Sequence, residues 1–246
     1  MSVDSPEDLE GLRRAGAAVA ATLRAVRRLV RPGVTTAELD AAAAAELRRH
    51  GARSAPALVY DFPGAICISV GDEAVHGIPG ARRLRAGDLV TLDVTAERDG
   101  FFADAAVTVV VGPGNPRGRR MAVAAQAALK RGMEVARAGM PVSAIGEAVE
   151  REVTRRGFTV LGELAGHGIG RTIHEDPEVL NVAGGSDEPL TDGLVITIEP
   201  IIADGDRLCV ERGDGWTVAT LGGSPAAHAE HTLVVRDGAP PLVLTA

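Results

Sequence analysis

The sequence predicts an α+β fold made of two similar halves, and two observations carry this prediction. Three separated segments recur at a constant offset of 106 residues: residues 31–40 match 137–146, 46–51 match 152–157, and 89–93 match 195–199. In each half, two helical stretches precede apolar, β-branched runs that are typical of buried strands. Helix pairs followed by antiparallel strands, twice over, indicate an α+β fold. We therefore expect one fused unit, residues 1–246, with halves of about 1–114 and 115–246.

Start and stop signals predict the helices of the first half. Residues 5–8 (SPED) place a capping serine, a first-turn proline and two acids where a helix N-terminus favours them. This helix is expected to run to about Leu29. Thr36 is expected to cap a second helix, which runs to about Arg49 before Gly51 stops it. The apolar runs that follow predict strands at 66–70, 89–96 and 104–111.

The second half repeats this order after a loop rich in glycine and proline at residues 112–116 (GPGNP). The predicted helices and strands of this half follow in sequence. They are helices at about 117–137 and 142–156, then strands near 158–165, 171–174, 194–201, 207–212 and 229–236.

Composition excludes several classes of protein. The net charge of −7 argues against a general nucleic-acid binder, which would carry a basic excess. The two cysteines, Cys67 and Cys209, make no disulfide framework, which fits a reducing cytoplasm. The acidic N-terminus has no signal-peptide pattern, and no apolar stretch reaches membrane-spanning length. We therefore expect a cytoplasmic monomer that uses neither a membrane nor a nucleic acid as partner.

Four acids and one histidine stand in distinctive local settings: Asp93, Asp104, His167, Glu199 and Glu230. The repeat sets Asp93 opposite Glu199. A looser match, with about twenty residues inserted, sets Asp104 opposite Glu230. Two halves packed about a pseudo-two-fold axis would bring these pairs face to face. Converging carboxylates repel unless a cation lies between them, and carboxylates with one imidazole suit Mn, Fe, Co or Zn.

Taken singly, each of these residues has a simpler interpretation. Asp93 and Asp104 fit a hairpin with its tip at residues 98–100, as solvated acids at strand ends. His167 stands in a glycine-rich segment that argues against a helix and fits an ordinary turn. His76 fits a structural histidine, and Cys67 fits a small buried apolar residue. Glu199 is the strongest single indication of a metal site, because burying a carboxylate at the end of an apolar strand costs free energy unless it is paired or metal-bound.

Seven motifs considered together resemble those of one family. They are residues 75–79 (VHGIP), 92–95 (LDVT), 100–104 (GFFAD), 166–177 (GHGIGRTIHEDP), 197–200 (TIEP), 214–218 (DGWTV) and 230–232 (EHT). In order and spacing they resemble the type I methionine aminopeptidases of peptidase family M24. The resemblance extends from Pro6 to about Val235. It implies the pseudo-two-fold pita-bread fold, in which two αβ halves surround a curved antiparallel sheet.

The resemblance also implies a centre of two divalent metal ions, either Co, Mn, Fe or Zn. Asp104 and Glu230 would bridge the two ions. Asp93 would complete the ligands of one ion, and His167 with Glu199 those of the other. This ligand set is implied by the family and not by the spacing alone.

The implied activity is removal of the initiator methionine from nascent proteins and peptides, with a preference for a small second residue. A water or hydroxide that bridges two ions is activated near neutral pH. Glu199 would accept its proton, His174 would stabilise the tetrahedral intermediate, and His76 would contact the peptide nitrogen and help protonate the leaving amine. The implied partners are nascent chain N-termini, with transient contact to the ribosome.

Departures from the family pattern lie in the substrate pocket. Phe62, Cys67 and Trp216 match positions that line the pocket for the methionine side chain. Ile173 stands where the family often has an aromatic residue, and His228-Ala229 replace a common Gln-aromatic pair. A pocket of altered shape is therefore expected beside an intact ligand set.

Two other functions compete with this interpretation. A proline-directed aminopeptidase P or prolidase shares the fold and a similar ligand set. However, those proteins usually carry a sizeable extra N-terminal domain, whereas only about 60 residues precede the first pocket strand here. A non-catalytic binding protein on the same fold would be expected to have lost ligands. All five ligand candidates and both histidines are present, which argues against a binding protein. Residues 75–79 (VHGIP) and 230–232 (EHT) favour the methionine enzyme over the proline-directed ones.

Overall fold

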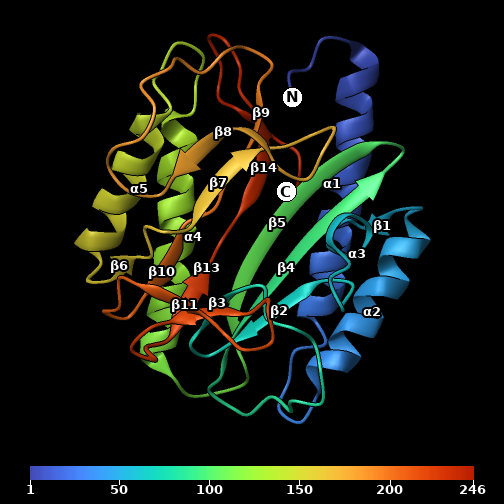
Figure 1. The fold of residues 1–246 in the computed structure, drawn as a ribbon, viewed down its shortest axis with the longest axis vertical. Helices are drawn as coiled ribbons and strands as arrows, with labels where there is room; N and C mark the ends of the chain where they lie inside the picture. The colour runs from blue at the N-terminus through green and yellow to red at the C-terminus, as the bar shows by residue number, and fades with distance from the viewer.

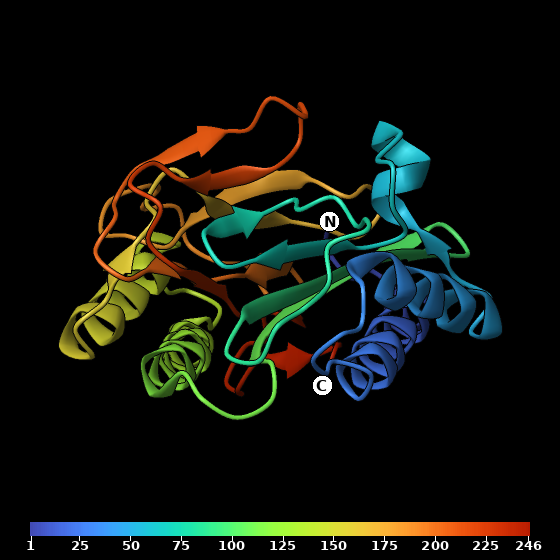
Figure 2. The ribbon, with the colours of Figure 1, turned by 90° about the horizontal axis from the view of Figure 1, so that it is seen from below.

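The computed structural model describes residues 1–246 and confirms the α+β prediction. Figure 2 shows four long helices on one side of the strands. They are α1 (Pro6–Arg27), α2 (Thr36–Arg49), α4 (Pro116–Val135) and α5 (Ser143–Arg155). A fifth, short helix, α3 (Ala55–Tyr60), precedes the first pocket strand. None of the helices is both long enough and apolar enough to span a bilayer.

The sheet of the first half is antiparallel and centres on a long hairpin (Figure 1). Its strands are β1 (Arg53–Ser54), β2 (Cys67–Val70), β4 (Leu89–Arg98) and β5 (Phe101–Val110). The hairpin joins β4 to β5 and turns at Asp99 and Gly100, whose φ angles are 54° and 80°. The tip predicted at residues 98–100 is therefore confirmed.

The second half contributes a five-stranded sheet and most of two small ones. The larger sheet has the order β15 (Leu242–Val243), β14 (His231–Val234), β9 (Val195–Ile198), β7 (Ala165–Gly168) and β8 (Glu175–Leu180). One small sheet has the order β13 (Ala226–His228), β10 (Ile201–Ala203) and β6 (Thr159–Val160). The other has the order β11 (Cys209–Glu211), β12 (Val218–Thr220) and β3 (Glu73–Val75).

The offset of 106 residues reappears in the strand pairing. In the first half, Arg53 of β1 pairs with Glu97 of β4. In the second half, Thr159 of β6 pairs with Ala203 of β10. Each residue of the second pair lies 106 positions after its counterpart in the first pair. The halves meet where the chain after β13 lies against β5. There the Glu230 backbone N–H donates to the Ala106 carbonyl over 3.0 Å. Glu230, the last of the four candidate acids, is thus fixed to the hairpin that carries Asp93 and Asp104.

Strand alternation separates the core from the polar residues. Leu92 and Val94 belong to a core cluster formed with α1 and α2, and Ile196 and Ile198 to a second one formed with α4 and α5. Successive side chains of a strand point to opposite faces. The polar residues that alternate with these core residues therefore lie on the face away from the helices: Asp93, Thr95, Thr197 and Glu199.

Several element boundaries differ from the predictions. Thr35 caps α2 in place of Thr36, through a capping box with Glu38. The strand predicted at 158–165 is two strands, β6 and β7, in different sheets. The strand predicted at 171–174 is wrong, because that segment is a turn and the strand follows as β8. The strand predicted at 194–201 ends at Ile198 as β9, and β10 begins at Ile201 in another sheet. Seven elements were not predicted: β1, α3, β3, β8, β12, β13 and β15.

Helix α5 packs so closely on the chain after β8 that it tolerates no side chain at Gly146. A Cβ there would lie 2.1 Å from the Val182 carbonyl oxygen, which is backbone and cannot rotate away. We expect Gly146→Ala to lower the free energy of unfolding by about 1–3 kcal/mol, although alanine favours helices by about 1 kcal/mol. Chemical denaturation beside the exposed control Glu147→Ala checks this; a stabilised Gly146→Ala variant would contradict the packing.

Candidate active site

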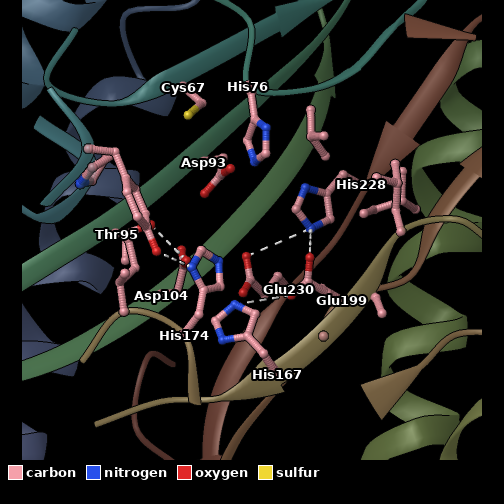
Figure 3. A pocket seen from close by; sticks show the side chains of 18 of the residues that line it. Cys67, His76, Asp93, Thr95, Asp104, His167, His174, Glu199, His228 and Glu230 are labelled. Carbon is pink, nitrogen blue, oxygen red and sulfur yellow. Dashed lines mark hydrogen bonds and ion pairs between the residues drawn. The ribbon is translucent and has the colours of Figure 1, made fainter. Parts of the chain in front are cut away.

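A cavity of about 560 Å³ lies on the face away from the long helices (Figure 3). All ten residues singled out from the sequence line it: Phe62, Cys67, His76, Asp93, Asp104, His167, His174, Glu199, Trp216 and Glu230. Of the three departures, Ile173 and His228 also line it, whereas Ala229 is fully buried beside β5. Both halves contribute, so neither forms the cavity alone.

The cavity lining has a large excess of negative charge. Eight of its 24 lining residues are aspartate or glutamate, and none is lysine or arginine. Carboxylates grouped in a low-dielectric site repel one another strongly when ionised. With no lysine or arginine to compensate, this charge is balanced either by protons on the acids themselves or by cations from outside the chain.

The hairpin of the first half holds Asp93 and Asp104 with one oxygen each left free. The Thr95 hydroxyl donates to Asp104 Oδ2 over 2.7 Å and so fixes the orientation of that carboxylate. Oδ1 of Asp93 and Oδ1 of Asp104 are buried without any hydrogen-bond partner. Buried polar atoms are rarely left unpaired, so these oxygens are available to a ligand.

The second half positions its acids in a similar way. The Thr197 hydroxyl donates to Glu199 Oε1 over 2.9 Å and accepts from the His167 backbone N–H over 3.0 Å. Thr197 therefore links the Glu199 carboxylate to β7, the strand that carries His167. Glu230 is 2% exposed, and its Oε1 has no partner.

Burial raises the pKa of Asp93, Glu199 and Glu230 well above the usual range of a carboxylic acid, and the neighbouring carboxylates raise it further. Divalent cations between the carboxylates would offset both effects, because they favour the ionised form. The donor set thus fits divalent metal ions.

His167 has the tautomer that metal binding requires. Its Nδ1 lies 2.8 Å from the Gly168 carbonyl oxygen, which only accepts, so Nδ1 carries the proton. Nε2 is then unprotonated and lies 3.5 Å from Glu199 Oε1. Burial, with a smaller contribution from His174, lowers the His167 pKa to about 4 and keeps the ring neutral. Donor atoms of Asp104, His167 and Glu230 lie within 4.8 Å of one another, close enough to hold one ion.

Two further histidines lie nearer to solvent at the mouth of the cavity. The His174 ring centroid is 4.3 Å from that of His167, and the Tyr60 hydroxyl lies 2.7 Å from His174 Nδ1. His76 has a φ of 57°, a left-handed conformation that turns its side chain toward the acids (Figure 3). Both imidazoles therefore face a molecule that enters the cavity.

One wall of the cavity is apolar. The Phe62 and Trp216 rings meet edge to face, with centroids 5.2 Å apart. Cys67 is buried and pairs with Asp93 across β2 and β4, and Ile173 is 4% exposed. The buried thiol has a pKa well above its usual range, mainly through burial, so it acts as an apolar lining group.

Sequence reasoning missed the hydrogen bonds of Tyr60 and Thr95 in the cavity and of Thr197 behind Glu199. It named His228 as a departure in the substrate pocket but not its position beside the acids. Thr197 had a detectable signal, because it precedes Glu199 by two positions and so shares its strand face. Thr95 reaches Asp104 only through the hairpin pairing, and Tyr60 reaches His174 only through the tertiary fold.

Two pseudo-symmetric αβ halves around an acid-lined cavity define a class of metal-dependent hydrolases with the pita-bread fold. The model of metallopeptidase family M24 matches residues 10–237, and the chain belongs to this family. It is 42% identical to "Methionine aminopeptidase 2" of Bacillus subtilis over 248 aligned positions, covering 100% of this chain and 99% of that protein. It is 38% identical to a methionine aminopeptidase of Aquifex aeolicus, covering 98% of this chain and 97% of that protein.

Solved structures agree with the fold prediction. The methionine aminopeptidase of Rickettsia prowazekii superposes with a TM-score of 0.95 at 33% identity, covering 100% of both chains. The prolidase of Pyrococcus furiosus superposes with a TM-score of 0.79 at 22% identity, covering 99% of this chain and 65% of that one, so it shares the fold. The predicted pita-bread architecture is thereby confirmed.

Proposed function

We propose that this chain is a metal-dependent methionine aminopeptidase that removes the N-terminal methionine from nascent proteins and peptides. Membership of family M24 and full-length similarity to proteins named methionine aminopeptidases support the activity. The observation that carries the proposal is the cavity itself, with its excess of buried carboxylates and no lysine or arginine. The two halves, about 1–114 and 115–246, act as one catalytic unit.

The ligand assignment follows the donors that the cavity offers. Asp104 and Glu230 would serve as shared ligands of two ions, either Co, Mn, Fe or Zn. Asp93 would complete the ligands of one ion, and His167 with Glu199 those of the other. The unpaired buried oxygens of Asp93, Asp104 and Glu230 support this assignment. When bound, such ions supply Lewis-acid activation of water and polarisation of the scissile carbonyl.

Protein side chains carry out the proton transfers. Glu199, with Oε1 held by Thr197, accepts the proton of the attacking water. His174 donates a hydrogen bond to the oxyanion; the Tyr60 hydroxyl at its Nδ1 favours the tautomer with Nε2–H free to donate. His76 contacts the peptide nitrogen and supplies a proton to the leaving amine.

Substrate selection follows from the cavity walls. The methionine side chain lies against Phe62, Cys67 and Trp216, an apolar wall that accepts a thioether. A small second residue is preferred. Ile173 takes the place of an aromatic residue, which widens this pocket for the methionine side chain.

The cellular setting follows from charge and composition. The net charge of −7 provides no excess of basic residues for binding nucleic acid, so contact with the ribosome is transient. The substrate is the N-terminus of the nascent chain. We infer that the chain works in the cytoplasm as a monomer.

Hydrolysis of three peptides tests the proposal. The chelated protein is reloaded with Mn, Fe, Co or Zn in turn and assayed with Met-Ala-Ser, Met-Pro-Ser and Ala-Pro-Ser. Release of methionine from Met-Ala-Ser alone, dependent on added metal, is the expected result. Cleavage confined to the Ala-Pro bond would move the assignment to the proline-directed enzymes. Tight metal binding without any turnover would favour a binding protein.

A further inference from the structure

His228 is the one imidazole of the cavity whose two ring nitrogens are both buried and without a hydrogen-bond partner. It lies at the end of β13 and is 2% exposed, and neither Nδ1 nor Nε2 has a partner. Its backbone is rigidly held: its N–H donates to the Thr108 hydroxyl over 2.7 Å, and that hydroxyl donates to its carbonyl over 2.8 Å. A firmly positioned ring with two unpaired nitrogens indicates that its partner is a ligand of the cavity.

The ring is aimed at the two acids of the second half (Figure 3). Nε2 lies 3.8 Å from Glu199 Oε2 and 3.7 Å from Glu230 Oε2. Both separations are too long for hydrogen bonds. They match two donors on one cation, because nitrogen and oxygen ligands about 2.0–2.2 Å from an ion lie roughly 3.4–3.8 Å apart at wide ligand angles.

His167 faces the other carboxylate oxygen of Glu199 at a similar distance. Its Nε2 lies 3.5 Å from Glu199 Oε1, whereas His228 Nε2 faces Oε2. Glu199 is thus flanked by two imidazoles, one at each oxygen. Residues 228 and 230 are also two apart along an extended chain, which places His228 and Glu230 on the same face.

We propose that His228 is an additional nitrogen ligand of the metal centre, beside Glu199 and Glu230. This inference rests on the dinuclear centre of the proposed function and adds a second imidazole to it. Nitrogen donors favour Co and Zn over Mn more than carboxylates do. The second imidazole therefore biases this chain toward Co or Zn.

His228 is the weaker of the two histidine ligands. The Nδ1–H of His167 is held by the Gly168 carbonyl, whereas Nδ1 of His228 has no protein acceptor. Such outer partners typically contribute about 10–100-fold to metal affinity. We therefore expect His228→Gln to weaken Co binding by about tenfold, less than His167→Gln does, and to weaken Mn binding less than Co.

Proton NMR of the Co-loaded wild-type protein tests the proposal without any variant. Two exchangeable, paramagnetically shifted imidazole N–H signals are expected, one from each histidine ligand. The His228→Gln protein should lose one of them, and the control His50→Gln, whose ring lies outside the cavity, should keep both. Competition with a chromophoric chelator then measures the affinities for Co and Mn in each protein.

The outcomes separate this inference from the function on which it rests. Tight Co binding with a single imidazole signal in the wild-type protein would overturn the role of His228 and leave the dinuclear centre in place. An unchanged Co-to-Mn affinity ratio in a folded His228→Gln protein would overturn it too. Failure of the wild-type protein to bind Co would overturn the proposed function together with this inference.

Discussion

Replacing Glu199 by glutamine is expected to lower kcat for methionine release by about 10³-fold, the range attributed to a positioned general base. Glutamine keeps the size of the side chain and its contact with the Thr197 hydroxyl, which reaches Glu199 Oε1 over 2.9 Å. It cannot accept a proton, and it removes one negative charge from the metal centre. The loss should therefore appear in kcat far more than in KM.

Steady-state kinetics with Met-Ala-Ser, together with metal analysis of the same samples, check this expectation. Glu178→Gln is the matched control, because Glu178 also lines the cavity but is exposed at its edge. We expect it to change kcat by less than about threefold, as is usual for a solvated acid. A Glu199→Gln protein that binds both metals and keeps kcat within tenfold would exclude Glu199 as the base.

Replacing Glu230 by glutamine is expected to have opposite effects on activity and on the stability of the metal-free protein. Methionine release should fall by about 10³-fold or more, since the variant loses the proposed shared ligand of the metal centre and metal activation contributes several kcal/mol. The metal-free protein should become more stable at neutral pH. The variant no longer buries an acid whose pKa is raised well above 4.5 by burial and by the charge of Asp104.

The pH dependence gives the sign of this effect. The unfolded chain ionises Glu230 near its ordinary pKa of 4.5, whereas the metal-free folded state holds the proton to a higher pH. The folded state thus binds more protons, so its stability falls as pH rises from about 4.5 toward the raised pKa. Metal-free Glu230→Gln should show a smaller fall than the wild-type protein.

Denaturation of the metal-free protein between pH 5 and pH 8, beside the exposed control Glu147→Gln, measures this dependence. Metal-loaded wild-type protein should lose most of the slope, because bound cations favour the ionised carboxylate. Equal slopes in metal-free wild-type and Glu230→Gln protein would show that Glu230 carries no raised pKa.

The sequence predicted the parts of the site that rest on local patterns. The hairpin from Asp93 to Asp104 was readable because an apolar, alternating run breaks at Asp99-Gly100 and resumes in the same register. The repeat paired Asp93 with Glu199, and the structure places both on the face away from the helices. His228 was also readable, since a histidine two positions before Glu230 shares its face in an extended chain.

The parts that were missed depend on contacts between distant segments. The single strand predicted at 158–165 is divided because β6 pairs with β10 whereas β7 pairs with β8 and β9, and no local pattern reveals a change of sheet. At 171–174 the Glu175 carboxylate accepts from the Arg171 and Thr172 backbone N–H groups, which makes a turn. Tyr60 reaches His174 across 114 positions of sequence.

The docking of the segment around Glu230 onto β5 has a consequence for biosynthesis. The proposed ligands run in chain order from Asp93 to Glu230, and the last is held to the first hairpin by its backbone hydrogen bond to Ala106. A growing polypeptide shorter than about 230 residues therefore lacks a complete metal centre, even if its first half has already folded. With these proposed ligands, we expect the peptidase to be inactive throughout most of its own translation and to bind its full set of metal ions only after the whole chain has folded.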